Sequence, residues 1–163
     1  MQWQARAGQM ADEWEIQRLA RLYAYAMDNT ASEVIDAIFT EDGELRFREE
    51  GFMRWPGTPP RGHVALREVP PMLAKRYFAT LHIIHNQLTT VLGDDRAEGQ
   101  TYCTAEHLEK DKAGGHTIYR MRIRYLDQYR RERGAWRFSC RELMAEWTDV
   151  RQVTNGQPRR PTL

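Results

Sequence analysis

The chain has 163 residues, which is the usual size of one globular domain and long enough to bury a core without disulfide or metal support. Hydrophobic residues make up 41% and charged residues 29%, a composition that excludes a disordered chain. A formal net charge of +1 provides no global field that would attract nucleic acid or an anionic membrane, so we expect neither as a partner.

Two further features bear on the compartment. The chain has two cysteines, Cys103 and Cys140, and such low usage is typical of a reducing environment in which thiols stay free. The N-terminus carries acidic residues and Trp14 where a secretory signal needs an unbroken apolar run, and nowhere are ~18 apolar residues consecutive. We therefore expect a cytoplasmic protein.

Helical periodicity dominates the first part of the chain. From Ala11 to Asp28 the apolar residues recur every three or four positions, which predicts one amphipathic helix. A second, shorter helix is predicted from Ala31 to Phe39, and the two form a helical hairpin. After turn residues at 40–43, the alternation from Glu44 to Phe47 indicates a short edge strand.

The middle of the chain is rich in residues that interrupt regular structure. Gly51 to Gly62 contains three prolines and three glycines, which predicts a loop, although Phe52 to Trp55 has a pattern suited to brief strand pairing. His63 to Tyr77 has a helical apolar face interrupted by two prolines, so we expect a short or broken helix.

The remainder of the chain is β-rich. Turn signals separate four long runs, which predicts antiparallel strands at Thr80–Leu92, Arg96–Leu108, His116–Arg130 and Ala135–Trp147. Helices followed by a meander of strands are typical of an α+β domain in which a strongly curved, mostly antiparallel sheet wraps over helices on one face. We predict a single domain at 1–150 and a C-terminal tail at 151–163.

Strand alternation separates the histidines of the first long strand. Side chains two residues apart share a face, so His82, Asn86 and Leu88 are predicted on one face, and His85 and Gln87 on the other. Two histidines on opposite faces do not bind one metal ion. Because no glycine-rich nucleotide signature occurs either, we predict neither a metal nor a cofactor.

A carboxylate beside one of these histidines would give it a chemical role. A lone histidine among apolar residues is usually a hydrogen-bonded core residue, whereas a carboxylate on one ring nitrogen leaves the other free to act as a base. Asp28 opposes the dipole of the predicted helix that it ends, although it also suits a helix-ending turn with Asn29. Tyr25 is its nearer neighbour on the helix surface, since Tyr23 lies roughly 140° away at ~100° per residue.

Four segments together carry a family resemblance. They are Ile16-Gln17-x-Leu19 continuing through Tyr23 and Tyr25 to Asp28, Phe39-Thr40-Glu41-Asp42-Gly43, Leu81-His82-Ile83-Ile84-His85-Asn86, and Tyr129 to Arg133 followed by Gly134-x-Trp136-x-Phe138. With them the chain resembles, from Ala11 to Trp147, the SnoaL-like proteins of the nuclear transport factor 2-like superfamily. The resemblance implies a cone-shaped α+β barrel.

Within that superfamily the chain is most similar to the branch of hexachlorocyclohexane dehydrochlorinase, bile acid 7α-dehydratase and scytalone dehydratase, which are cofactor-free lyases. The resemblance implies that His82 is the base, that Asp28 orients it, and that Tyr23 and Arg141 assist catalysis at the leaving group. Simple alternation places Arg141 on the face opposite Trp136 and Phe138, so a pocket role for this arginine requires either a β-bulge or that the two aromatic residues lie on the convex side.

Further residues are predicted to contact the substrate. Asn86 matches the dehydrochlorinase strand by resemblance. His85 is a substitute base if the strand register differs by one residue, and otherwise a surface or subunit-contact residue. The complete predicted set of substrate-binding residues is Tyr25, Asn86, His85, Tyr102 and Tyr125.

The predicted function is a cofactor-independent, dehydratase-like lyase acting on a hydrophobic steroid-like, aromatic or polyketide-like small molecule in an enclosed pocket. Elimination needs a base of near-neutral pKa, which a carboxylate-held histidine supplies. An isomerase or cyclase with the same dyad and a non-catalytic small-molecule-binding module are the alternatives. Long strands with an exposed sheet face also predict a homo-oligomer, with a trimer preferred over a dimer.

Overall fold

A computed structural model describes the chain except residues 1, 49–56, 111, 113 and 158–163. Within the described residues, five helical segments and five strands follow one another in the order α1 (Gln2–Asn29), the 3₁₀ turn η1 (Ser32–Val34), α2 (Ile35–Ile38), β1 (Phe39–Phe47), α3 (Gly62–Leu66), α4 (Val69–Arg76), β2 (Ala79–Val91), β3 (Arg96–Lys110), β4 (His116–Glu132) and β5 (Ala135–Val153). None of these helices is both long enough and apolar enough to cross a membrane.

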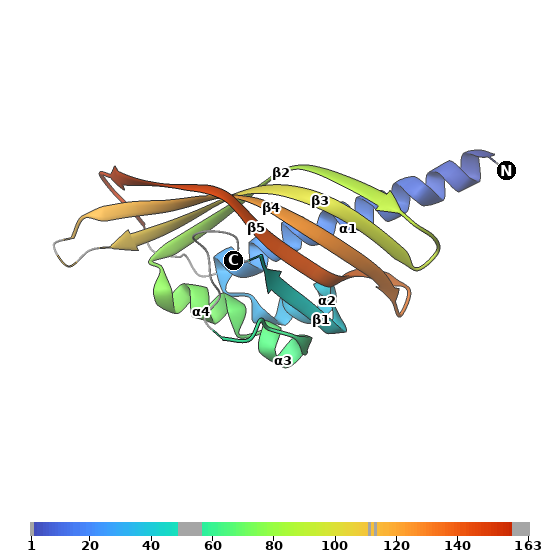
Figure 1. The fold of residues 1–163 in the computed structure, drawn as a ribbon, viewed down its shortest axis with the longest axis horizontal. Coiled ribbons are helices and arrows are strands. Elements are labelled where there is room, and N and C mark those ends of the chain that lie inside the picture. Colours follow the sequence, from blue (N-terminus) through green and yellow to red (C-terminus); the bar gives the residue numbers. More distant parts are fainter. Residues whose placement is uncertain (1, 49–56, 111, 113, 158–163) are drawn as a thin grey trace.

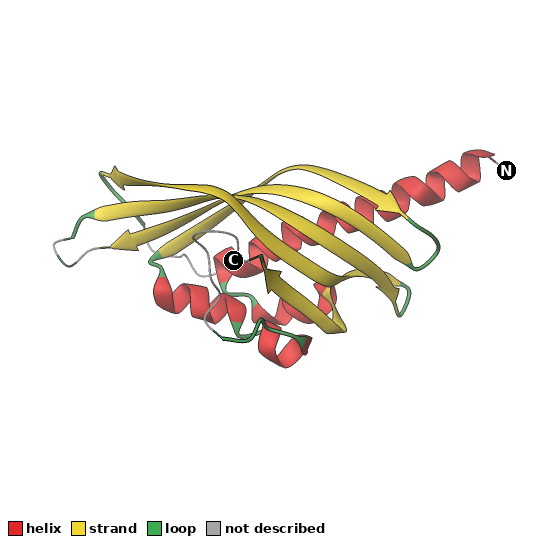
Figure 2. Ribbon diagram, viewed as in Figure 1, coloured by secondary structure: helices red, strands yellow, loops and turns green. Residues whose placement is uncertain are grey.

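The strands form one curved sheet in the order β1-β5-β4-β3-β2. β1 is parallel to β5, and the other neighbours are antiparallel. The helices gather on one side of this sheet, and the N-terminal turns of α1 extend beyond its end (Figures 1 and 2). This is the predicted α+β cone, and we call the face toward the helices the inner face and the opposite one the outer face.

Helix α1 joins the core through one stripe of its surface. Ile16, Leu19, Tyr23 and Met27 are buried at the predicted three- and four-residue spacing. The helix begins at Gln2 rather than at Ala11, and Trp14 is exposed on its surface. Its last turns lie along β2, the edge strand of the sheet, and therefore bring the end of the helix to that strand.

The segment after α1 differs in detail from the prediction. The expected helix at Ala31–Phe39 is divided into η1 and α2, and β1 begins at Phe39 rather than at Glu44. Phe39 already pairs with Phe138, and the register then shifts before Glu44. Gly43 permits this close crossing, because a Cβ atom there would lie 3.0 Å from the carbonyl oxygens of Phe138 and Thr40.

The broken helix predicted after the loop is confirmed as α3 and α4. Pro70 and Pro71 occupy the first turn of α4, where a missing backbone N–H costs no helical hydrogen bond. The predicted pairing of Phe52–Trp55 lies outside the described residues.

The four predicted antiparallel strands are confirmed as β2 to β5. β5 continues to Val153, which pairs with His116, so regular structure extends slightly into the segment predicted as a tail. Both cysteines are buried and free, as expected.

Three β-bulges in β2 and β5 change which side chains reach the interior. In β2 the register shifts between Ile84 and Gln87, and in β5 the pairing leaves out Ser139 and, further along, Glu146. Because one extra residue reverses the alternation, each bulge moves the side chains that follow it to the other face, as far as the next bulge of that strand. The simple alternation predicted for 82–88 is therefore wrong beyond Ile84.

Candidate functional site

The sequence-predicted pair of Asp28 and His82 forms a direct contact. Asp28 Oδ1 lies 2.6 Å from Nδ1 of His82, and the two side chains are only 15% and 5% exposed. Since an ionised carboxylate can only accept hydrogen bonds, Nδ1 of the imidazole carries the shared proton. In the neutral ring, Nε2 is then the unprotonated nitrogen and is free to act as a base.

The end of α1 and the start of β2 hold Asp28 in place from both sides. Its Oδ2 accepts the backbone N–H of His82 at 2.7 Å, and Thr80 Oγ1 donates to its Oδ1 at 2.9 Å. Thr80 and His82 share the inner face by strand alternation, which is regular before the bulge. The carboxylate therefore stabilises the edge strand by accepting the backbone N–H of His82, and it orients the imidazole of the same residue through Nδ1.

A second histidine, which the sequence analysis did not single out, adjoins the pair. The ring centroid of His107 on β3 lies 5.8 Å from that of His82, at nearly a right angle, and His107 Nδ1 lies 3.3 Å from the carbonyl oxygen of Tyr119. Burial, reinforced by the positive charge that His82 can carry, lowers the pKa of His107 to about 4. His107 is consequently neutral at physiological pH.

This lowered pKa predicts a pH-dependent stability. The unfolded chain protonates His107 near pH 6.5, whereas the folded chain keeps it neutral down to about pH 4. Its contribution is complete above pH 6.5 and is lost as the pH falls to about 4, by an amount on the order of 3 kcal/mol. Urea unfolding at several pH values should show a shallower dependence in His107→Gln than in the wild type. An identical dependence in both proteins would contradict the assignment, and the exposed His85→Gln serves as control.

A groove leads to this site between α1 and β2. Its cavity volume is about 430 Å³, and it is lined by Gln17, Arg21, Ala24, His82, Ile84, His85 and Gln87. Gln17, Arg21 and Ala24 follow one another on α1 at spacings of four and three residues, and Asp28 comes four residues later. The three groove residues therefore lie on the same side of the helix as Asp28. The groove is partly open to solvent, so among the described residues His82 borders an open recess and not the enclosed chamber that the sequence predicted.

Arg141 reaches the interior because of the β5 bulge. The bulge at Ser139 brings it to the same face as Trp136 and Phe138, and its side chain is fully buried. Its guanidinium carbon lies 3.8 Å from the ring centroid of Tyr125 and 4.5 Å from those of Tyr23 and Phe138. Arg141 thus occupies an aromatic cage on the inner face.

The charge of Arg141 is balanced by Asp127 on β4, another residue that the sequence analysis missed. Arg141 Nη2 donates to Asp127 Oδ2 at 3.3 Å, and Nε lies 3.2 Å from Oδ1, within ion-pair distance but without hydrogen-bond geometry. Thr101 Oγ1 and the hydroxyl of Tyr129 also donate to Oδ2, at 3.0 and 3.1 Å. Burial raises the pKa of Asp127, while the neighbouring guanidinium opposes that rise.

The tyrosines of the cage remain protonated. Burial raises the pKa of Tyr23 to about 12 and that of Tyr125 well above its usual value. Burial raises the pKa of the Cys103 thiol to about 12, and the charges of both Arg141 and Asp28 act on this thiol. Tyr23 therefore belongs to the Arg141 cage, and Cys103 lies between that cage and the Asp28–His82 pair.

Strand register separates the two groups along the sheet. His82 pairs with Ala105, whereas Arg141 pairs with Asp127 and, through it, with Gly99. Ala105 and Gly99 are six residues apart on β3, which corresponds to about 20 Å of strand. The predicted catalytic residues thus form two neighbouring clusters and not a single constellation.

Several predicted substrate contacts are placed elsewhere. Tyr25 is 44% exposed on the solvent side of α1, because Tyr23 and Met27 take the inward positions. Tyr102 lies on the outer face, where Arg124 stacks on its ring at 5.3 Å. Of the five residues predicted to bind substrate, Tyr125 alone is buried on the inner face.

The bulge in β2 accounts for the remaining two. His85 and Asn86 both occupy it and are exposed, so the prediction that Asn86 shares a face with His82 is wrong. His85 Nε2 contacts Thr104 Oγ1 at 2.7 Å, and the ring borders the groove at its outer rim. Gln87, predicted on the opposite face, instead joins His82 in lining the groove.

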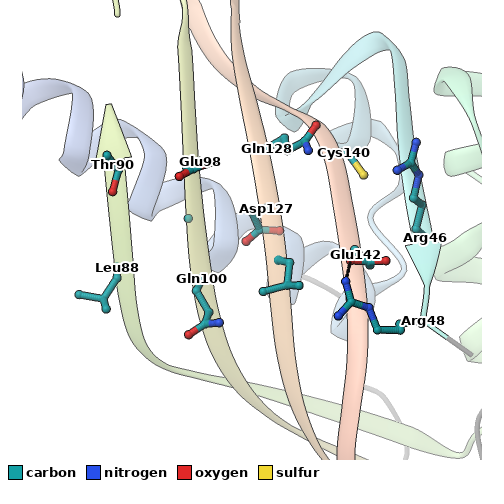
Figure 3. Close-up of a pocket in the computed structure, with 12 residues that line it drawn as sticks. Arg46, Arg48, Leu88, Thr90, Glu98, Gln100, Asp127, Gln128, Cys140 and Glu142 are labelled. Carbon is teal, nitrogen blue, oxygen red and sulfur yellow. Dashed lines mark hydrogen bonds and ion pairs between the residues drawn. The ribbon is translucent and has the colours of Figure 1, made fainter. Parts of the chain in front are cut away.

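A second recess lies on the outer face of the sheet. Its volume is about 520 Å³, and side chains from all five strands surround it, with α1 visible behind the sheet (Figure 3). Leu88 and Leu126 supply apolar surface, whereas Arg46, Arg48 and Glu142 form the charged end. It lies on the other side of the sheet from the Asp28–His82 contact.

Residues 8–142 match the SnoaL-like domain family. The fold resembles Kfla4162 from Kribbella flavida, with a TM-score of 0.74 and 21% identity over 86% of this chain and 94% of that one. For the hexachlorocyclohexane dehydrochlorinase LinA-type3 from Novosphingobium barchaimii the TM-score is 0.74 at 16% identity, covering 92% and 97% of the two chains.

A candidate scytalone dehydratase from Novosphingobium aromaticivorans gives a TM-score of 0.70 at 21% identity, with 94% of each chain covered. A comparison with curated protein sequences gives no match. At these identities the structural likeness establishes the fold, and the family match extends over most of the sequence. The chain therefore belongs to the SnoaL-like domain family, within the nuclear transport factor 2-like fold.

Proposed function

We propose that the protein is a cofactor-independent lyase that eliminates water from a hydrophobic small molecule bound beside His82. The observation that carries this proposal is the 2.6 Å contact between Asp28 and His82, which is almost fully buried yet borders a groove. A buried carboxylate on one imidazole nitrogen is the arrangement that makes the other nitrogen a base at neutral pH.

In the proposed reaction His82 Nε2 removes a proton from a substrate carbon next to an activating group. Asp28 stabilises the imidazolium that forms, because its charge lies against Nδ1–H. The electron pair of the broken C–H bond forms the new double bond as the C–O bond breaks. The departing hydroxide takes the proton from Nε2 of the His82 imidazolium and leaves as water, which returns His82 to its neutral form and balances the reaction.

The Arg141 cage supplies hydrogen-bond donors for developing negative charge. Tyr23 and Tyr125 are protonated at neutral pH because burial raises their pKa values, and Arg141 Nη1 has no hydrogen-bond partner in the described part of the chain. We propose that these groups stabilise an enolate oxygen that is conjugated with the reacting carbon but lies at the far end of the substrate, because the leaving group itself is on the carbon next to the one that His82 deprotonates. This role requires a substrate long enough to extend past Cys103, which suits steroid-like, polycyclic aromatic and polyketide-like molecules.

An isomerase or cyclase using the same base is the alternative supported by a specific observation. The Asp28–His82 contact supports it as well, because the imidazolium formed by removing a proton from one substrate carbon can return that proton to another. Proton removal is shared by the two reactions, and only the fate of the carbanion differs. Product analysis therefore separates them.

The test is a screen of hydroxylated steroids, terpenoids and polyketides for loss of water by mass spectrometry, with wild type and His82→Ala. We expect His82→Ala to lower turnover by roughly 10²- to 10⁴-fold, the usual contribution of a general base. His85→Ala is the matched control and should remain active. Turnover that survives in His82→Ala and is lost in His85→Ala would assign the role of base to His85. A small molecule that binds to the wild type without being converted would indicate a binding module.

We also propose that the chain is a cytoplasmic homo-oligomer, preferably a trimer, that associates through its outer sheet face. Leu81, Ile83, Leu88 and Trp147 are large apolar side chains on that face, with 53%, 40%, 71% and 59% of their surfaces exposed. Exposed apolar area of this kind is typical of an interface. Light scattering of the purified protein should give a multiple of the chain mass, with Leu88→Asp shifting it toward the monomer; a wild-type monomer would refute the proposal.

A further inference from the structure

Gln87 is the polar side chain that the β2 bulge turns into the groove. It lies on the same face as His82 and lines the same recess. Its Nε2 donates to the hydroxyl oxygen of Tyr129 at 3.1 Å. This hydrogen bond connects the groove to the buried Arg141–Asp127 pair.

The direction of every hydrogen bond in this connection follows from Arg141. A guanidinium can only donate, so Asp127 is its acceptor, and Asp127 Oδ2 also accepts the hydroxyl of Tyr129 at 3.1 Å. With its proton directed to Asp127, the Tyr129 oxygen can only accept from Gln87. The amide NH₂ of Gln87 must therefore face Tyr129.

This fixed orientation leaves one group of Gln87 for a ligand. The carbonyl oxygen Oε1 has no hydrogen-bond partner in the described part of the chain, and it belongs to a side chain that lines the groove. We propose that Gln87 Oε1 selects ligands that present a hydroxyl donor over analogues that offer only an acceptor. The inference deepens the proposed function, on which it rests for the identity of the bound ligand as substrate.

The position of Gln87 indicates which hydroxyl it recognises. Gln87 pairs with Thr101 and His82 with Ala105, four residues apart on β3 and so about 13 Å along the strand. A hydroxyl bound at Gln87 is therefore remote from the carbon that His82 deprotonates and is not the leaving group. The substrate thus has a second hydroxyl, or an equivalent N–H donor, at its far end.

NMR of the ligand-free protein tests the orientation. With the amide NH₂ facing Tyr129, nuclear Overhauser effects should connect the side-chain amide protons of Gln87 with the ring protons of Tyr129. In Tyr129→Phe the hydrogen-bonded amide proton should return to the chemical shift of a solvated glutamine. Absence of the Overhauser effects, or an unchanged amide shift in Tyr129→Phe, would overturn the proposed orientation.

Binding of 4-phenylcyclohexanol and 4-phenylcyclohexanone tests the selectivity, because the two probes differ only in hydroxyl against carbonyl. Wild type should bind the alcohol about tenfold more tightly, as expected for one hydrogen bond gained against an unpaired acceptor. Gln87→Met should bind both about equally. Tyr129→Phe should bind the ketone better than the wild type does, because the Gln87 amide can then rotate and present its N–H to the ligand. If Tyr129 had only a structural role, the substitution would weaken the binding of both probes alike.

The proposal would be overturned if the wild type bound the two probes equally, bound the ketone more tightly or bound neither. It would also be overturned if Gln87→Met left the ratio of the two affinities unchanged. His82→Ala should retain the preference for the alcohol, because the two residues act at different ends of the groove. If the elimination hypothesis fails, the preference for the alcohol can still be observed. If the preference is absent, the effect of His82→Ala on turnover still tests the elimination.

Discussion

Replacing Asp127 with alanine is expected to lower the free energy of unfolding by about 3–5 kcal/mol, the usual cost of leaving one member of a buried ion pair alone. Both side chains of the Asp127–Arg141 pair are completely buried. The substitution also removes the acceptor for Thr101 and Tyr129, whose hydroxyls donate to Oδ2. Urea unfolding monitored by tryptophan fluorescence measures the change.

Two controls identify the cause. Glu142→Ala removes one partner of the Arg48–Glu142 pair, whose side chains are 37% and 26% exposed, and should cost no more than about 1 kcal/mol. The double variant Asp127→Leu/Arg141→Met should be more stable than Asp127→Ala, because no uncompensated charge remains. A loss below about 1 kcal/mol in Asp127→Ala would show that the buried charge is relieved by another route.

Asp28→Asn is expected to reduce turnover by roughly 10³- to 10⁴-fold with little change of fold. The amide oxygen can keep the hydrogen bond from the His82 backbone N–H, which lies 2.7 Å from Oδ2 in the wild type. The amide NH₂ then faces Nδ1 of His82 and donates to it. This forces the ring proton onto Nε2, the nitrogen that the proposed reaction needs as a base.

The tautomer can be observed without a substrate. Nitrogen-15 NMR of the His82 ring should show a protonated Nδ1 in the neutral wild-type imidazole and a protonated Nε2 in Asp28→Asn. The matched control is Asp36→Asn, which alters an aspartate paired with Arg67 at the surface and should leave both tautomer and turnover unchanged. A wild-type tautomer in Asp28→Asn, or wild-type turnover, would remove Asp28 from the proposed mechanism.

The two predictions probe different functions of buried carboxylates in one fold. Asp28 lies at the edge of the sheet, where its side chain is 15% exposed and borders the groove residues. Asp127 is enclosed and offsets the charge of an arginine that aromatic rings surround. We therefore expect loss of Asp28 to act mainly on chemistry and loss of Asp127 mainly on stability.

Repeating local patterns allowed much of the fold to be predicted. The apolar stripe of α1 and the runs of β2 to β5 extend over many residues, so periodicity and turn residues identify them without tertiary information. The positions of Asp28 and His82 also followed from the sequence, through a helix end and a family resemblance. Their contact agrees with that expectation because Thr80, His82 and Ile84 precede the bulge, where alternation is regular.

What sequence alone determined about this protein is the set of elements and their family; tertiary structure decided which side chains meet. A β-bulge is one extra residue without a repeating signal, so its position depends on packing against both neighbouring strands. The bulges at 85–86 and at Ser139 direct Gln87 and Arg141 inward and expose Asn86. The Asp127–Arg141 pair and the position of His107 beside His82 depend likewise on register between strands, which no local pattern records.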